Sequence, residues 1–292
     1  MHFVIFIADS HVDMFMDIVH MFIAGMQAQS SSNTFEFYPH CSCRHDNPHN
    51  NNCTKSIPAD FNTDTRRFVT FGGGLTRHTI PDNSIINIFD WWEWERQHYI
   101  DYSPRCILYT YSQRDLKLAK ELIPNARIFM FDFCYSPALD GYQDMPKQLD
   151  ASFYGGHSDR RVQIVNAIRA NGVNVHYTPG GWCYGQQRTD LLNKSKVVLA
   201  IFSGGCGFNH TIGSRIFPAI SHGAFVVAEQ STDEDVNQTL QPYCIVCPAA
   251  DMPSVVKYWS THDEEREALR AQFHQRFKDH IPTFDCSWMT QE

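Results

Sequence analysis

Residues 151–178, ASFYGGHSDRRVQIVNAIRANGVNVHYT, contain the pattern that decides the fold. The run ASFYGG is typical of a strand that enters a glycine turn, and Ser158 is a suitable N-cap for the helical segment that follows. Gly172 ends that segment, and the apolar run VNVHYT comes directly after it. A strand, a helix and a second strand in this order predict two parallel strands joined by a crossover helix.

The same alternation continues on both sides of this segment. Toward the C-terminus the sequence predicts helices at 188–195, at 212–223, from about 253 and at 263–280, and strands at 196–203, 224–229 and 242–247. Toward the N-terminus it predicts helices at 12–26 and 114–123, and strands at 2–8, 35–38, 67–71, 84–89, 106–111 and 126–131. Strands that are apolar on both faces are typical of parallel sheets covered by helices.

An aperiodic segment rich in turn formers, residues 134–150, separates two such alternating halves. We therefore expect an α/β protein of two Rossmann-like domains that face each other across a cleft, with domains at 1–145 and 146–292.

Composition indicates an ordinary globular protein. The 292 residues are 43% hydrophobic, enough for two cores, and the formal charge of −8 gives no overall attraction to nucleic acid or anionic membranes. The ten cysteines form no small-domain disulfide framework, and the N-terminus lacks the basic region of a secretory leader. We expect reduced cysteines, no membrane span, and a cytoplasmic protein, or one in the host cytoplasm if the chain is viral.

The loops after the strands of the second half carry groups suited to a nucleotide. Ligands of open parallel sheets bind beyond the carboxyl ends of the strands, where helix N-termini offer free N–H groups. Arg160, Arg161 and Arg215 can neutralise phosphate, Trp182 can cover a planar base, and Glu229 can accept hydrogen bonds from hydroxyl groups. The other candidates in these loops are Gly156, Gly181, Gly204, Gly205, Asn209, His210 and Thr211. Together they predict a site for a nucleoside diphosphate that carries a hydroxylated group.

Four ordered elements of this half, FYGG with SDRR, YTPGGW, LLNKSKVVLAIF and SRIFPAISHGAFVVAE, carry a family resemblance. Over about 150–280 the chain resembles the donor-binding domain of GT-B glycosyltransferases, and most of all the spore-maturation-type, family-1-like group. Arg215, Phe217, Gly223 and Glu229 match the last motif of that group. The resemblance implies that Glu229 ends its strand at the donor pocket. Pro218 stands where the group usually has a glutamate that holds the ribose hydroxyls.

Structural roles are the alternative for several of these residues. Arg160 or Arg161 could be part of a solvated first helical turn, and Trp182 could be a core residue at a domain interface. Arg215 and Glu229 could form a structural ion pair.

The first half is expected to supply the acceptor site. An inverting transfer needs a group that takes the proton of the acceptor hydroxyl, and the loop after the first strand holds such groups. His11 is the candidate base, with Asp9 or Asp13 orienting it, unless Asp9 merely caps the following helix. Trp91, Trp92 and Trp94 are candidates for an acceptor stacking platform, or for the buried face of an amphipathic helix.

A metal is not expected at the donor site, because no acidic pair is placed to hold Mg²⁺ on a diphosphate. The polar loop at 40–53 holds His40, Cys41, Cys43, His45, His49 and Cys53, but their spacing matches no standard zinc motif. The predicted function is transfer of a sugar from a nucleotide sugar to a hydroxyl of a glycan, a metabolite, a protein or a hydroxymethylated DNA base, without a cofactor. The alternative is a catalytically silent nucleotide- or sugar-binding protein of related fold.

Overall fold

The computed structural model describes residues 1–7, 12–37, 61–71, 80–88, 96–177, 183–204 and 213–282, apart from the side chains of residues 12–14 and 213–214. The chain forms two compact units, Met1–Phe133 and Cys134–Ile281, and Pro282 belongs to the first.

The division between the units lies ahead of the expected domain boundary at 145/146, because the segment after Phe133 is bonded to the second unit. Asn193 accepts a hydrogen bond from the Gln143 N–H (2.9 Å) and donates one to the Gly141 carbonyl (3.0 Å). The Tyr142 hydroxyl donates to Glu267 (2.9 Å). These contacts attach the segment to helices of the second unit.

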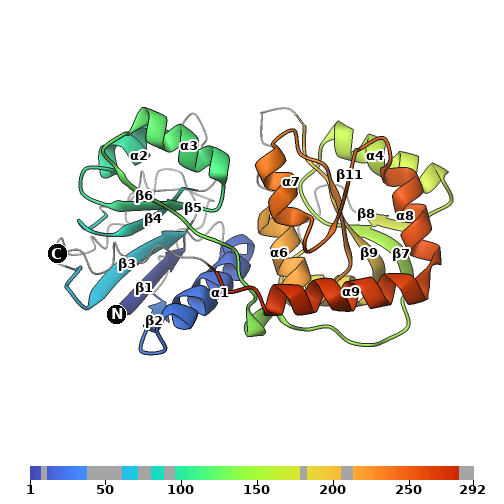
Figure 1. Ribbon diagram of the computed structural model, residues 1–292, viewed down its shortest axis with the longest axis horizontal. Coiled ribbons are helices and arrows are strands. Elements are labelled where there is room, and N and C mark those ends of the chain that lie inside the picture. The colour runs from blue at the N-terminus through green and yellow to red at the C-terminus, as the bar shows by residue number, and fades with distance from the viewer. Residues whose placement is uncertain are drawn as a thin grey trace, which may run out of the picture. The chain divides into compact units, whose positions relative to one another are not determined.

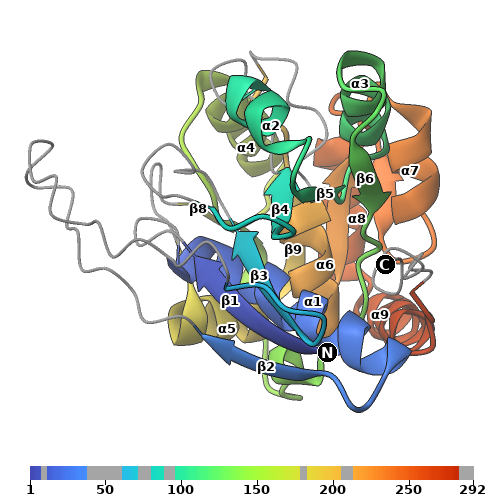
Figure 2. The same ribbon diagram turned by 90° about the vertical axis from the view of Figure 1, so that its left-hand side faces the viewer.

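The first unit is built on a parallel sheet, and all its strand pairs within the described residues are parallel. Its strand order is β2-β1-β3-β4-β5-β6, and β2 lies beside β1 at one edge (Figures 1 and 2). In that order the strands are Thr34–Phe37, His2–Ile7, Arg66–Phe71, Ile85–Ile88, Ile107–Thr110 and Arg127–Met130.

Helices cover both faces of this sheet. On one face α1 (Val12–Gln29) packs Phe15, Ile18 and Phe22 against β1, β3 and β5. On the other face α2 (Arg96–Tyr102) and α3 (Gln113–Leu122) pack against residues of β1, β3 and β4. The strands are buried on both sides, which explains why they read as continuous apolar runs.

The second unit repeats this architecture with five parallel strands in the order β11-β10-β9-β7-β8. In that order the strands are Ile245–Cys247, Val226–Glu229, Ser195–Ala200, Leu149–Phe153 and Val175–Tyr177. The helices are α4 (Asp159–Ala170), α5 (Gly185–Lys194), α6 (Gly213–His222), α7 (Glu234–Leu240), α8 (Met252–Thr261) and α9 (Asp263–Lys278), with a short 3-10 helix at Pro137–Leu139.

The main core of the second unit lies between its sheet and helices α4, α8 and α9. Val165 and Ile168 of α4 and Val256 of α8 are fully buried there against strands β7 and β9. Helices α5 and α6 contact the sheet as well, and α9 runs along the base of the unit beside α6 and α8 (Figure 1).

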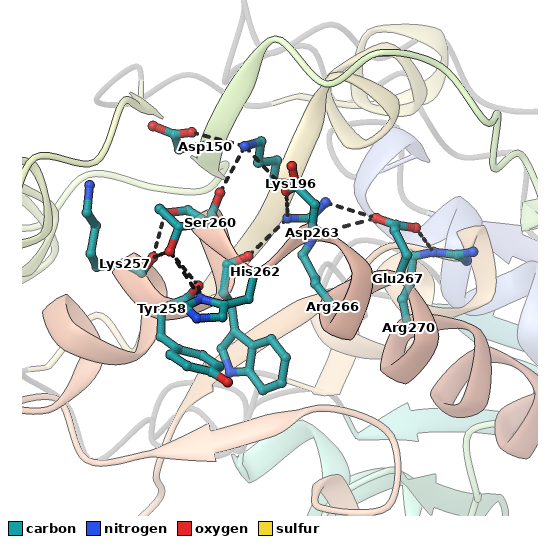
Figure 3. Close-up of polar contacts among 12 residues, drawn as sticks. Asp150, Lys196, Lys257, Tyr258, Ser260, His262, Asp263, Arg266, Glu267 and Arg270 are labelled. Carbon is teal, nitrogen blue, oxygen red and sulfur yellow. Dashed lines mark hydrogen bonds and ion pairs between the residues drawn. The ribbon is translucent and has the colours of Figure 1, made fainter.

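A charged network joins α8 and α9 (Figure 3). Arg266 is only 2% exposed, and it donates to the Trp259 carbonyl (3.0 Å), to Asp263 (2.5 Å) and to Glu267 (3.1 Å). Lys196 of β9 reaches Asp263 at 3.4 Å. The buried guanidinium is thus fully paired, as a charge taken out of water must be.

The predicted α/β class and the parallel sheets are confirmed. Helix α7 was not predicted, although Asp233 caps it by accepting from the Asp235 N–H (3.1 Å). Within the part of the chain that the structure describes, none of the helices is long and apolar enough to cross a membrane.

Candidate functional site

The strand order of the second unit defines where a ligand is expected. Strand β7 has β8 on one side and β9 on the other, so the direction of the chain crossovers reverses between β7 and β9. Open parallel sheets bind ligands in the crevice beyond the carboxyl ends of the strands at such a switch point. Helix α4 begins there, capped by Ser158, whose hydroxyl accepts from the Arg161 N–H (3.2 Å). Its free N–H groups and partial positive charge favour an anion.

Arg160 and Glu229 form an ion pair at this edge. Two guanidinium nitrogens of Arg160 donate to the two carboxylate oxygens of Glu229, one of them at 2.8 Å. The Phe202 N–H also donates to Glu229 (2.9 Å), whose side chain is 5% exposed. The hydrogen bond with Glu229 raises the pKa of Arg160. These two residues therefore neutralise each other, and the alternative of an Arg215–Glu229 pair is wrong.

Arg161 and Arg215 are two cations of the site that have no carboxylate paired with them among the described residues. Both guanidinium groups lie 5.4 Å from the centroid of the Phe153 ring. Arg161 donates to the carbonyls of Ile201 (3.1 Å) and Gly156 (2.8 Å). Among the described residues, neither arginine has an Asp or Glu within ion-pair distance.

The electrostatics of the two groups reflect this lack of counter-charge. Burial, reinforced by the nearby Arg215 cation, lowers the pKa of Arg161 to about 10. Burial also lowers the pKa of Arg215. Because removing a cation from water is unfavourable without an anion beside it, the pair of guanidinium groups is suited to bind one.

Two glycines make room for the arginines. A Cβ on Gly155, where φ is +149°, would lie 2.8 Å from the Arg215 Nη2. A Cβ on Gly204, where φ is +60°, would overlap the Arg160 Cδ. Glycine at these positions therefore serves the placement of side chains, whereas the sequence suggested close approach of a ligand.

The structure brings together Gly156, Arg160, Arg161, Gly204, Arg215 and Glu229, all from the predicted donor set. The other predicted residues lie outside the described part of the chain, or have side chains that do: Asp9, His11, Asp13, Trp91, Trp92, Trp94, Gly181, Trp182, Gly205, Asn209, His210 and Thr211. Sequence reasoning missed Phe153, although an aromatic residue just ahead of the glycine turn was a usable signal.

Over the described ranges, no three His, Cys, Asp or Glu side chains gather closely enough to hold a metal ion. The Cys- and His-rich loop at 40–53 is outside these ranges.

Comparison with known proteins agrees with this geometry. Residues 143–282 match the family described as glycosyl transferase-like. The fold of the whole chain resembles that of WaaG, a glycosyltransferase of lipopolysaccharide biosynthesis, with a TM-score of 0.54 and 10% identity over 96% of this chain and 95% of WaaG. It also resembles T4 phage BGT, solved with its UDP-glucose substrate, with a TM-score of 0.52 and 11% identity over 95% of this chain and 94% of BGT.

A third similar structure is S. aureus TarM, solved with UDP, with a TM-score of 0.54 and 9% identity. That match covers 78% of this chain, which spans only 54% of TarM. Among proteins of curated function, none matches the sequence. The chain thus has the GT-B fold of two Rossmann-like domains, and the match to the glycosyl transferase-like family lies almost entirely within its second unit.

Proposed function

We propose that this chain is a glycosyltransferase that binds a nucleoside-diphosphate sugar in its second unit and transfers the sugar to a hydroxyl acceptor. The observation that carries the proposal is the pair of guanidinium groups at the switch point of the sheet, Arg161, which is buried, and Arg215, which is partly buried; neither has an acidic partner among the described residues. UDP-glucose bound to T4 phage BGT and UDP bound to TarM support a nucleotide donor.

The chemistry follows from where charge develops. The bond between the anomeric carbon and the diphosphate oxygen breaks as the acceptor oxygen attacks that carbon, and the leaving diphosphate gains negative charge. Arg161, Arg215 and the N-terminus of α4 stabilise this charge without a metal ion.

The acceptor proton must pass to a base of the first unit. The strand order of that unit places its own switch point between β1 and β3. In the sequence, Asp9 and His11 follow directly after β1. We keep His11 as the proposed base, oriented by Asp9 or Asp13.

The acceptor class stays open among a glycan, a metabolite, a protein and a hydroxymethylated DNA base. A cytoplasmic location is part of the proposal, since Cys106, Cys134, Cys183, Cys244 and Cys247 are all free thiols.

Nucleotide binding tests the donor site. UDP, GDP, CDP, ADP, TDP and their sugar conjugates are screened by thermal shift, because a ligand of the folded state raises the melting temperature. One nucleotide is expected to bind selectively. Arg215→Ala should weaken that affinity more than tenfold, since a charge-assisted contact of about 1.5–3 kcal/mol is lost.

The control is Arg276→Ala, which removes an exposed guanidinium of α9 whose one hydrogen bond to a described residue is to the Pro242 carbonyl. It should leave nucleotide affinity unchanged. Equal effects of the two variants, or no binding by the wild type, would remove the proposed donor site.

A second candidate function is nucleotide or sugar binding without turnover. Two observations favour it. Pro218, inside helix α6, stands where the resembled group usually has a glutamate for the ribose hydroxyls. The Glu229 carboxylate already accepts hydrogen bonds from Arg160 and from the Phe202 N–H.

A further inference from the structure

Tyr177, the last residue of β8, has a buried hydroxyl without a partner. Its side chain is 8% exposed, and the hydroxyl makes no hydrogen bond within the part of the chain that the structure describes. A buried hydroxyl that has lost its water contacts without gaining a protein partner is unfavourable. Such a group in a native fold calls for a ligand or a water molecule that satisfies it.

The position of Tyr177 favours a ligand. It pairs with Phe153 across β7 and β8, and the two rings pack edge to face with centroids 5.1 Å apart. Phe153 is the residue over which Arg161 and Arg215 also lie. Arg161 and Tyr177 thus share Phe153 as a neighbour, and an ionised Tyr177 would raise the pKa of Arg161. The Phe153 ring is thus in contact with two cations that lack a counter-charge among the described residues and with the ring of Tyr177, whose hydroxyl has no partner among those residues.

We infer that the Tyr177 hydroxyl donates a hydrogen bond to the diphosphate of the nucleotide ligand, as the third polar group of the site formed with Arg161 and Arg215. This inference rests on the proposed donor site. The hydroxyl adds a neutral, directional donor beside two cations, so it favours a phosphate oxygen held at one defined position.

Tyr177→Phe tests the inference, because it removes the hydroxyl and keeps the ring that packs on Phe153. Calorimetric titration uses two probes: the nucleoside diphosphate that gives the largest thermal shift among UDP, GDP, CDP, ADP and TDP, and inorganic pyrophosphate, which carries no base. The variant should bind both about tenfold more weakly than the wild type, as expected for loss of a hydrogen bond to a charged group. Its melting temperature should be unchanged or higher, since no protein hydrogen bond is lost.

Ser152→Ala is the matched control. The Ser152 hydroxyl is also fully buried without a partner among the described residues, but adjacent positions of β7 point to opposite faces, so it faces away from Phe153. This variant should bind both probes as the wild type does.

The outcomes separate the two proposals. Wild-type affinity in Tyr177→Phe, together with weakened binding in Arg215→Ala, overturns the role of Tyr177 and leaves the donor site standing. A loss of affinity in Tyr177→Phe matched by an equal loss in Ser152→Ala also overturns it. Failure of the wild type to bind either probe overturns both proposals.

Discussion

At the residue scale, Gly204 shows how local backbone freedom supports the candidate site. Its left-handed conformation, with φ of +60°, lets the Arg160 side chain cross above it to reach Glu229. Any side chain here would strain the backbone and also displace Arg160 from the buried carboxylate.

We therefore expect Gly204→Ala to lower the free energy of unfolding for two reasons. The left-handed conformation costs about 1–2 kcal/mol for alanine, and disturbing the Arg160–Glu229 pair adds about 1–3 kcal/mol. Urea unfolding measures the total.

Gly185→Ala separates the two effects. Gly185 has φ of +52°, and a Cβ there would meet nothing within 4 Å. Gly185→Ala should therefore lose only the stability, about 1–2 kcal/mol, that the left-handed conformation costs alanine. If both variants lose the same stability, the Arg160 contact contributes nothing.

The same residues show what the sequence can and cannot predict about the site. Its arginines were found because they follow strands and begin or lie near helices, which places them at the carboxyl edge of a parallel sheet. The partner of each charge was not predictable. Arg160 and Glu229 are 69 residues apart, and only the tertiary fold, which brings the start of α4 to the end of β10, decides that Glu229 meets Arg160 and not Arg215.

At the scale of elements, strands were more predictable than helix boundaries. Strands that are buried on both faces give continuous apolar runs, whereas the start of a helix depends on a cap and a few polar residues. No helix is predicted from the sequence between the strands at 224–229 and 242–247, although Asp233 followed by Glu234 and Asp235 is a typical start for a helix such as α7.

Helix α6 departs from simple propensity. Pro218 lies in its interior and cannot donate to the carbonyl four residues earlier. Burial of the apolar face of α6 offsets this lost hydrogen bond, because Ile216, Phe217 and Ile220 are nearly fully buried. Packing therefore decides the structure of this segment, which is why its pattern still predicted a helix.

At the scale of the whole molecule, acid should destabilise the chain through His222. The residue is 4% exposed, and neither ring nitrogen has a hydrogen-bond partner within the described ranges. Burial, reinforced by the nearby Arg188 cation, lowers the pKa of His222 to about 4. The folded state therefore binds its proton less readily than the unfolded chain, whose histidine pKa is about 6.5.

The sign follows from proton linkage. The stabilisation from neutral His222 is fully present above about pH 6.5 and is lost as the pH falls toward 4, by about 3 kcal/mol in total. Urea unfolding of the wild type and of His222→Phe between pH 4.5 and 7 measures this contribution. The free energy of unfolding of His222→Phe should fall less on acidification than that of the wild type. If the two free energies fall equally with pH, another titrating group causes the loss of stability in acid.

The central claim is that the chain turns over a nucleotide sugar at the Arg161 and Arg215 site. The most direct measurement is ³¹P NMR of the nucleotide sugar that gives the largest thermal shift, incubated in EDTA with the wild type or with Arg215→Ala, with water as the acceptor. We expect the wild type to convert the diphosphate diester signals to those of the free nucleoside diphosphate, and Arg215→Ala to slow this conversion more than tenfold. A nucleotide sugar that stays bound and intact for days would contradict the account and identify a binding protein without turnover.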